Sequence, residues 1–296
     1  MNFKNVVKLF EVRTLVASVF PVLLGTVYSW YLYDQVNYIY LLLSLVAVPL
    51  MQGTTSMLND YFDYLSGADG SEKSDEKLLV SGEVRPDQVR CLIIVFQVIA
   101  LLIGVIIGHG TSYFIVLVGV IGSLISVLYA TGPIPISTTP FGELVSGLTM
   151  GVGITTTVIY IHSGYVNAST VMMAIPSAVY IGTILLSNNI SDMKEDREVG
   201  RKTLPIVIGL QRAEHLWIGA VYGLFFFVAI LWGLEVYPLG VLIAVMLVAP
   251  YGIEKKFLSY EKNRSTKGWT MGMIGKIGIK YHIALLVGLI MSRLMS

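Results

Sequence analysis

Long apolar runs alternate with short polar segments along the whole chain. Runs of roughly 20 mostly apolar residues, the length that crosses the hydrocarbon core of a bilayer, occur nine times. They lie at about 14–33, 39–58, 90–108, 112–130, 142–162, 168–190, 214–234, 236–253 and 281–296. Glycine and proline occur inside the runs, and the alternating ten-residue pattern of barrel strands is absent. The pattern therefore predicts an all-α fold, a polytopic transmembrane helical bundle of about nine helices.

The composition supports a membrane protein and excludes other classes. The 296 residues are 55% hydrophobic and 13% charged, about half the charged fraction of a soluble domain. The net charge of +1 lacks the basic surplus that would neutralise nucleic-acid phosphates, so no nucleic-acid partner is expected. The first run lacks the cleavage pattern of a signal peptide, so we expect it to be retained as a span. We expect a single transmembrane domain over 1–296, with no obligate protein partner.

The distribution of Lys and Arg predicts the orientation. Nine spans place the N-terminal segment and the segments at about 59–90, 191–213 and 254–280 on one side, and these contain every Lys and Arg except Arg293. By the positive-inside rule that side is the cytoplasm. The segment at about 252–280 is basic and aromatic and is expected to face lipid headgroups. Its alternative interpretation is a cap over a cytoplasmic cavity.

An Asp-rich motif ends the second predicted span. It runs from Asn59 through Asp60 and Asp63 to Tyr64, and Gly67 and Asp69 follow. On a helix, Asn59, Asp60 and Asp63 lie within one turn, with Asn59 and Asp63 stacked at positions i and i+4.

A second motif ends the sixth predicted span. Asn188 and Asn189 are followed by Ser191 and Asp192, and Asp196 comes one turn later. A continuous helix would place Asn188, Asp192 and Asp196 on one face at successive i+4 positions. Both motifs would then present carboxylates and an amide oxygen in one direction, at the same depth in the membrane.

These motifs predict a site for Mg²⁺ and a diphosphate. Carboxylates this close repel each other unless a cation neutralises them. Mg²⁺ suits oxygen ligands and takes one or two carboxylates together with water and substrate phosphates. The alternative, a pair of solvated helix ends, would not by itself explain why the pattern recurs 132 residues later, from Asp60 to Asp192. The spacing also favours a pseudo-repeat of about 1–130 and 131–253, followed by a C-terminal span.

Other polar residues are weaker candidates. Cations that would offset the charge of a departing diphosphate are expected on the cytoplasmic side, where each is also explained as ordinary positive-inside charge. Glu143 is either an acceptor-binding group or a helix-start carboxylate, and Asp69 is either a further acceptor-binding group or a loop charge. Tyr129 either reaches the phosphates or anchors at the membrane interface. The candidates for diphosphate binding are Arg13, Lys77, Tyr129, Arg197 and Lys202.

Taken together, the two motifs resemble those of the UbiA-type superfamily of intramembrane aromatic prenyltransferases. Within it, the chain is most similar to the 1,4-dihydroxy-2-naphthoate polyprenyltransferases of menaquinone biosynthesis. The supporting segments are Arg13–Leu15, Pro21–Thr26, Asn59–Asp69, Leu79–Gly82, Tyr129–Pro135, Gly142–Glu143 and Asn188–Leu204. The family commonly has Arg before the second-motif Asp, where this chain has Ser191, and Pro after the first-span Arg, where it has Thr14.

The resemblance implies a polyprenyltransferase of the bacterial or archaeal cell membrane. Its cofactor would be Mg²⁺, its substrates a polyprenyl diphosphate and a small aromatic acceptor, and its cavity would open to the cytoplasm and laterally to lipid. The catalytic residues would be Asp60, Asp63, Asp192 and Asp196, which would bind metal together with Asn59 and Asn188. The alternatives are another acceptor (a hydroxybenzoate, a haem or a glycerol phosphate lipid), terpene cyclisation, or a cation-coupled transporter.

Overall fold

The computed structural model describes residues 2–70 and 77–295, and every element of regular secondary structure in them is a helix. The chain forms two compact units. Unit 1 comprises residues 1–19 and 38–137, and unit 2 comprises residues 20–37 and 138–296. The predicted all-α fold is therefore confirmed. The single domain and the pseudo-repeat stay predictions.

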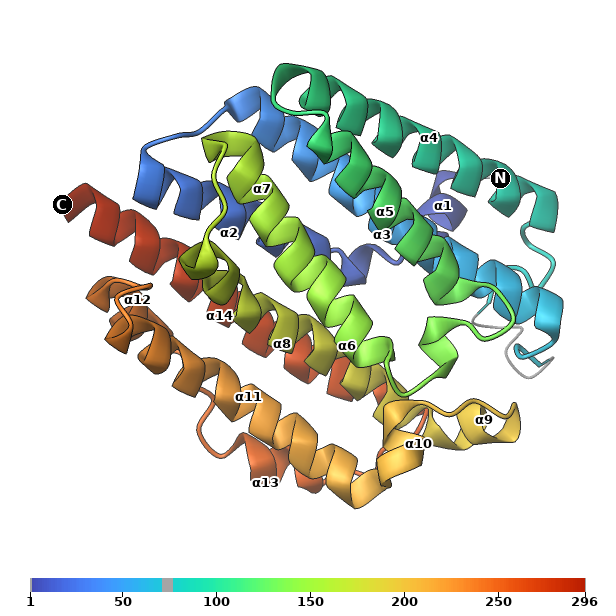
Figure 1. Cartoon of the computed structure of the whole chain (residues 1–296). Helices are drawn as coiled ribbons and strands as arrows, with labels where there is room; N and C mark the ends of the chain where they lie inside the picture. Colours follow the sequence, from blue (N-terminus) through green and yellow to red (C-terminus); the bar gives the residue numbers. More distant parts are fainter. Residues whose placement is uncertain (1, 71–76, 296) are drawn as a thin grey trace. The chain divides into compact units, whose positions relative to one another are not determined.

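Unit 1 is built around one long helix. Its elements are α1 (Phe3–Leu9), η1 (Val12–Thr14), α3 (Tyr38–Ser66), α4 (Pro86–Gly110) and α5 (Phe114–Ala130). Helices α3, α4 and α5 pack side by side, and α1 packs against α3 (Figure 1). A buried apolar cluster near the end of α3 includes Met57, Leu78 and Leu79, so the segment after residue 77 is fastened to the helix that carries the first motif.

Unit 2 contains the remaining helices. They are α2 (Val16–Tyr33), α6 (Gly142–Ser146), η4 (Gly147–Gly153), α7 (Ile154–Ser163), α8 (Ala168–Ser191), α9 (Met193–Glu198), α10 (Leu204–Ile208), α11 (Leu210–Gly233), α12 (Leu239–Met246), α13 (Ile253–Leu258) and α14 (Lys267–Met295). Helix α2 belongs to unit 2 from Phe20 onward, and the short helix η3 (Ile136–Thr138) lies at the boundary between the units. Helix α8 is central, because it packs against α6, η4, α11 and α14 (Figure 1). It also carries the second motif at its C-terminal end.

Among the described residues, seven helical stretches are long and apolar enough to cross a membrane. They are Val16–Tyr33, Tyr38–Ser66, Pro86–Gly110, Gly142–Ser163, Ala168–Ser191, Leu210–Gly233 and Lys267–Met295. Helix α5 is apolar but slightly shorter, at 17 residues. The protein is therefore an integral membrane protein with several spans.

Two of the nine predicted spans differ from the structure. The run at 236–253 holds only the eight-residue helix α12, which follows Pro238 and ends before Pro250, because proline disfavours helical continuation on either side. The run at 281–296 is the second half of α14, which begins at Lys267. Hydropathy detects only the part of a helix that matches the hydrocarbon core, whereas the polar first turns of α14 extend beyond it.

The segment at 252–280 is more firmly packed than the sequence indicates. Phe257 of α13 is fully buried and stacks on Trp217 of α11, with ring centroids 3.9 Å apart. The Lys262 side chain is 2% exposed and pairs with Glu214 at 2.7 Å. The expectation of a solvated, headgroup-facing segment is therefore wrong for these residues, because aromatic stacking and a buried ion pair fasten them to α11.

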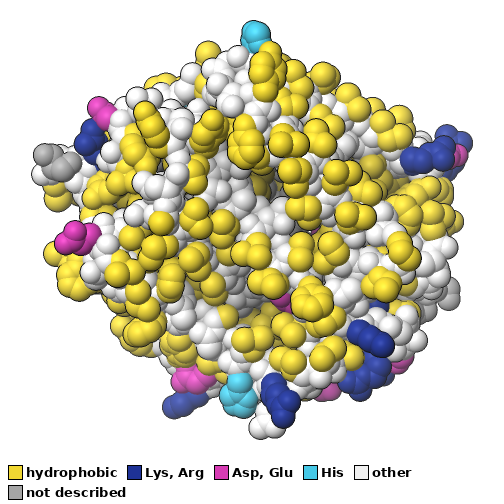
Figure 2. Space-filling model, viewed as in Figure 1, with side chains coloured by type: hydrophobic (Ala, Val, Ile, Leu, Met, Phe, Trp, Pro, Cys, Tyr) yellow, Lys and Arg dark blue, Asp and Glu magenta, His cyan; other side chains and the backbone are white. Residues whose placement is uncertain are grey.

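Apolar side chains dominate the outer surface. Figure 2 shows hydrophobic side chains over most of one face, with most of the charged side chains at its periphery. Helix α4 is the extreme case, since Ile94, Leu102 and Ile106 are each more than half exposed. Exposed aliphatic side chains in this number need lipid as their surroundings.

Candidate functional site

The first motif occupies the last turns of α3 in unit 1. Asn59, Asp60 and Asp63 all lie on the helix, as predicted, and are partly buried. The carboxylate of Asp60 accepts a hydrogen bond from the ammonium of Lys77, 17 residues further along the chain. Burial acts to lower the pKa of Lys77, but the adjacent Asp60 carboxylate outweighs it and holds that pKa above its usual range. Asp60 and Lys77 therefore form a charged pair.

Asp69 is brought back toward the same helix end. Gly67 has a φ of 72°, a left-handed conformation that glycine adopts without strain, and it turns the chain at the end of α3. The backbone N–H of Asp69 then donates to the carbonyl oxygen of Asp63 at 3.3 Å. Asp69 is buried, and its charge also raises the pKa of Lys77. The structure thus places Asp69 with the first motif, near Lys77.

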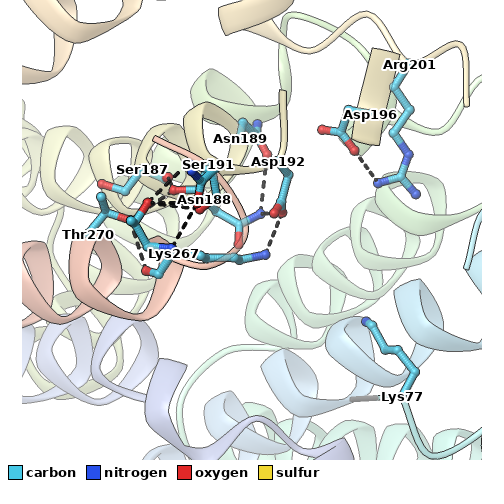
Figure 3. A network of polar contacts seen from close by, with 12 residues as sticks. Lys77, Ser187, Asn188, Asn189, Ser191, Asp192, Asp196, Arg201, Lys267 and Thr270 are labelled. Atoms are coloured by element: carbon cyan, nitrogen blue, oxygen red, sulfur yellow. Dashed lines mark hydrogen bonds and ion pairs between the residues drawn. The ribbon is translucent and has the colours of Figure 1, made fainter. Parts of the chain in front are cut away.

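The second motif occupies the end of α8 in unit 2. The Asn188 amide nitrogen donates to the Asp192 carboxylate at 3.2 Å and to the Asn189 side-chain oxygen at 3.5 Å. The same Asp192 oxygen accepts from the ammonium of Lys267 at 2.5 Å (Figure 3). Because the Asn188 nitrogen is used in this way, its carbonyl oxygen is the atom left to bind a cation.

The second motif does not lie on one continuous helix. Helix α8 ends at Ser191, Asp192 is its C-cap, and α9 begins at Met193. The Asp192 carboxylate points to Lys267, whereas the Asp196 carboxylate points to Arg201 at 3.2 Å (Figure 3). The predicted shared face therefore holds for Asn188 and Asp192, whose side chains are in contact. It is wrong for Asp196, because the helix is interrupted at Asp192.

Asp196 is the more deeply placed of these two carboxylates. Its residue is 6% exposed. Burial raises the pKa of Asp196 to about 6, with Arg201 opposing the shift and Asp192 adding to it. The backbone N–H of Arg201 also donates to the Asp196 carbonyl oxygen at 2.9 Å. Arg201 thus holds Asp196 through both its backbone and its guanidinium.

The other candidates lie in different settings. Tyr129 is on the last turn of α5 in unit 1, and Arg13 is in η1, with a side chain outside the described part of the structure. Arg197 and Lys202 are exposed in unit 2, and the described residues show no hydrogen bond from either side chain to a motif carboxylate. The cations that do contact the second motif, Arg201 and Lys267, were not singled out from the sequence.

Glu143 contacts the second motif through a hydrogen bond with Asn189. It lies at the start of α6, is 7% exposed, and accepts a hydrogen bond from the Asn189 amide at 2.9 Å. Its other carboxylate oxygen has no hydrogen-bond partner among the described residues. A chain of polar contacts therefore runs from Glu143 through Asn189 and Asn188 to Asp192.

Glu143→Leu should lower the stability of the protein by roughly 1–3 kcal/mol, because the buried Asn189 amide would lose its acceptor. Glu143→Gln keeps a carbonyl oxygen at this position and should cost less. Thermal unfolding of the purified proteins in one detergent measures both effects. Identical unfolding of the Leu and Gln variants would contradict this role.

Within the described residues, no three His, Cys, Asp or Glu side chains cluster closely enough to hold a metal by themselves. Each motif instead offers carboxylate and amide oxygens, a set that suits Mg²⁺ when water and phosphate complete its coordination. Each motif is therefore, within its own unit, a candidate binding site for a divalent cation.

Comparison with known proteins places the chain in a family. Residues 18–274 match the UbiA prenyltransferase family. A 1,4-dihydroxy-2-naphthoate octaprenyltransferase of Bacillus subtilis is 38% identical over 205 residues, which cover 69% of this chain and 66% of that protein. UbiA prenyltransferase domain-containing protein 1 of Danio rerio is 31% identical over 198 residues, which cover 65% of this chain and 58% of that protein. The matched region spans less than two thirds of either relative.

The fold is shared with solved structures. A UbiA homolog from Archaeoglobus fulgidus, bound to GPP and Mg²⁺, superposes with a TM-score of 0.64 at 15% identity. The match covers 95% of this chain and 99% of that chain. With the family match over residues 18–274, these findings show that the chain belongs to the UbiA prenyltransferase family.

Proposed function

We propose that the protein transfers a polyprenyl chain from its diphosphate to an aromatic acceptor in the presence of Mg²⁺. The acceptor we propose is 1,4-dihydroxy-2-naphthoate, which would give demethylmenaquinone in its reduced, quinol form. The observation that carries the proposal is the same in each unit. An Asp at the end of a membrane-spanning helix pairs with a lysine from a later segment of the chain, Asp60 with Lys77 and Asp192 with Lys267. The name of the Bacillus subtilis relative supports the choice of acceptor.

The residues present suit Mg²⁺. Asp60, Asp63 and Asn59 would hold it in unit 1, and Asp192, Asp196 and Asn188 in unit 2. A carboxylate that pairs with an ammonium or guanidinium group is ionised and can therefore bind a metal cation. Asn188 can contribute its side-chain carbonyl oxygen as a further ligand. When bound, the metal would neutralise the diphosphate and so make it a better leaving group.

The remaining groups would act on the diphosphate and the acceptor. Lys77, Arg197 and Lys202 would balance the phosphate charge together with Arg13, and Tyr129 would donate a hydrogen bond to a phosphate oxygen. The bond between the first prenyl carbon and the diphosphate oxygen breaks, and its electron pair leaves with the diphosphate. The ring carbon that bears the carboxylate supplies the pair for the new carbon–carbon bond. Loss of the acceptor carboxyl group as CO₂ then restores the aromatic ring.

The membrane would solvate the prenyl chain. The exposed apolar faces of the helices show that lipid surrounds the protein. A tail that stays in lipid avoids a cost of roughly 0.8 kcal/mol for each CH₂ exposed to water. The distribution of Lys and Arg supports a cytoplasmic position for both motifs. We propose a bacterial or archaeal cell membrane as the location, in line with the Bacillus subtilis relative.

Purified protein in detergent should form prenylated naphthol and pyrophosphate from a labelled polyprenyl diphosphate, dihydroxynaphthoate and Mg²⁺. Excess EDTA should suppress the reaction by at least about 100-fold, because the leaving group would lose its counter-charge. Added Mg²⁺ should restore it. Product formation is followed by chromatography and pyrophosphate release by a coupled assay.

The assay includes a hydroxybenzoate and a glycerol phosphate lipid as competing acceptors. Preferential product with either would replace the proposed acceptor and keep the transferase. Undiminished turnover in EDTA would exclude the metal, and absence of product with every acceptor would exclude the transferase.

A further inference from the structure

The first residue of α14 makes the closest contact with the second motif. The ammonium of Lys267 lies 2.5 Å from the Asp192 carboxylate, although 75 residues separate them in sequence. The Lys267 side chain is 34% exposed and the Asp192 side chain 22% exposed, so solutes can reach the pair. Figure 3 shows the lysine side chain extending along the end of α8 to reach the carboxylate.

A second contact between α8 and α14 fixes the position of the Lys267 backbone relative to Asp192. The hydroxyls of Ser191 and Thr270 lie 2.9 Å apart, and both residues are 1% exposed. The Thr270 hydroxyl also lies 2.9 Å from the Lys267 carbonyl oxygen, which it can donate to, and the Ser191 hydroxyl donates to the Ser187 carbonyl oxygen at 3.0 Å. This buried junction joins the first turn of α14 to the last turn of α8. Lys267 is therefore held next to Asp192 by the packing of two helices rather than by a surface encounter.

One oxygen atom of Asp192 accepts both of the side-chain hydrogen bonds that Lys267 and Asn188 make to this carboxylate. Its Oδ2 binds both the Lys267 ammonium and the Asn188 amide nitrogen. A divalent cation bound at this oxygen would repel the ammonium, since two positive charges would share one carboxylate oxygen. The ammonium would then have to move, and the flexible four-carbon stem of the lysine side chain allows it to do so without moving α14.

We propose that Lys267 is a place-holder cation: it neutralises Asp192 before Mg²⁺ binds, and then pairs with the diphosphate that arrives with the metal. This inference rests on the proposed function. Lys77 on Asp60 has the same arrangement in unit 1, so each motif is charge-balanced by a lysine from a later segment. Lys267 is a positioning residue for the metal and a binding residue for the diphosphate.

The proposal predicts opposite changes in two affinities. Lys267→Met should bind Mn²⁺, a spectroscopic substitute for Mg²⁺, several-fold more tightly, because the competing ammonium is gone. It should bind inorganic pyrophosphate in the presence of Mg²⁺ about tenfold more weakly, because one charge-assisted hydrogen bond is lost. Lys267→Arg keeps the charge and should restore most of the pyrophosphate affinity. Electron paramagnetic resonance measures free Mn²⁺, and calorimetry measures pyrophosphate binding.

Lys276→Met is the matched control. Lys276 is an exposed lysine on the same helix and should show the wild-type value in both measurements. If Lys267→Met weakens both affinities together, Lys267 has only a structural role and the inference fails, as it also does if Lys267→Met behaves like the control. If the wild type binds neither Mn²⁺ nor pyrophosphate, the proposed function itself fails. Lys267→Arg should return the Mn²⁺ affinity, as well as the pyrophosphate affinity, toward the wild-type value.

Discussion

Asp60→Asn and Asp192→Asn should each reduce prenyl transfer by at least about 1000-fold while the protein still inserts in the membrane. Each change removes one negative charge from a motif that we propose binds Mg²⁺, and groups that stabilise developing charge in a transition state typically contribute two to three orders of magnitude. The amide is nearly isosteric with the carboxylate, and its carbonyl oxygen still accepts a hydrogen bond from Lys77 or Lys267. The packing around each motif should therefore survive. Product formation per mole of purified protein is the measurement.

Asp87→Asn is the control for loss of negative charge. Asp87 lies in the first turn of α4, where its side chain is 82% exposed and contacts only Arg90 at 3.2 Å among the described residues. This variant should retain wild-type turnover. Size-exclusion profiles in detergent compare the folding of all three variants. Wild-type turnover by Asp60→Asn or Asp192→Asn would remove that residue from the proposed metal site.

The sequence was sufficient for most of the helices and for the position of both motifs. Hydropathy alone locates apolar spans such as α4 and α8, because the thickness of the bilayer requires a run of about 20 apolar residues. Asp60 and Asp192 stood out because carboxylates are costly at the end of an apolar span unless a cation is near. The structure supplied such cations, Lys77 and Lys267. Lys77 was among the candidates because it is close to its motif in sequence.

Lys267 could not have been found in the same way. It is 75 residues from Asp192, and the sequence placed it in a loop because hydropathy marks only the hydrocarbon-embedded part of α14. Arg201 also escaped notice, although the turn at Gly200, with a φ of 78°, brings it back to Asp196. Both contacts depend on where the chain turns, which apolar periodicity does not encode. Arg197 and Lys202 were equally plausible from charge alone and are exposed.

The packing of α14 on α8 explains why this chain has Ser191 where the family commonly has Arg. The position before the second-motif Asp is 1% exposed and faces Thr270 across a 2.9 Å contact between hydroxyls. An arginine in this conformation would have to displace α14 or bury its guanidinium, which is costly without a partner. The small side chain allows α14 to pack close to α8, and that packing brings Lys267 to Asp192. The cation at this motif thus comes from another helix.

Gly151→Ala should destabilise the protein by roughly 1–3 kcal/mol or more and reduce the yield of folded protein, because helices cannot shift easily where backbones touch. Gly151 lies in η4, a π-helical segment that packs directly on α8. A methyl group there would overlap the backbone of Ala178 and come within 2.7 Å of the Ser177 carbonyl carbon. Backbone atoms have no rotamer by which to move aside, so α6 and η4 would have to separate from α8. That separation would also draw Glu143 away from Asn189, and activity should fall with stability.

Gly104→Ala is the matched comparison, because Gly104 lies within α4 and a methyl group there meets nothing within 4 Å. Alanine favours the helix over glycine by roughly 1 kcal/mol, so this variant should be as stable as the wild type or more so. Thermal unfolding in detergent and recovery after size exclusion compare the two variants. Equal stability of the two variants would show that η4 and α8 can separate at little cost. In that case the packing of η4 on α8 would not be what keeps Glu143 within hydrogen-bond distance of Asn189. Loss of stability in Gly151→Ala only would establish that the close approach of η4 to α8 fixes the geometry on which the second motif depends.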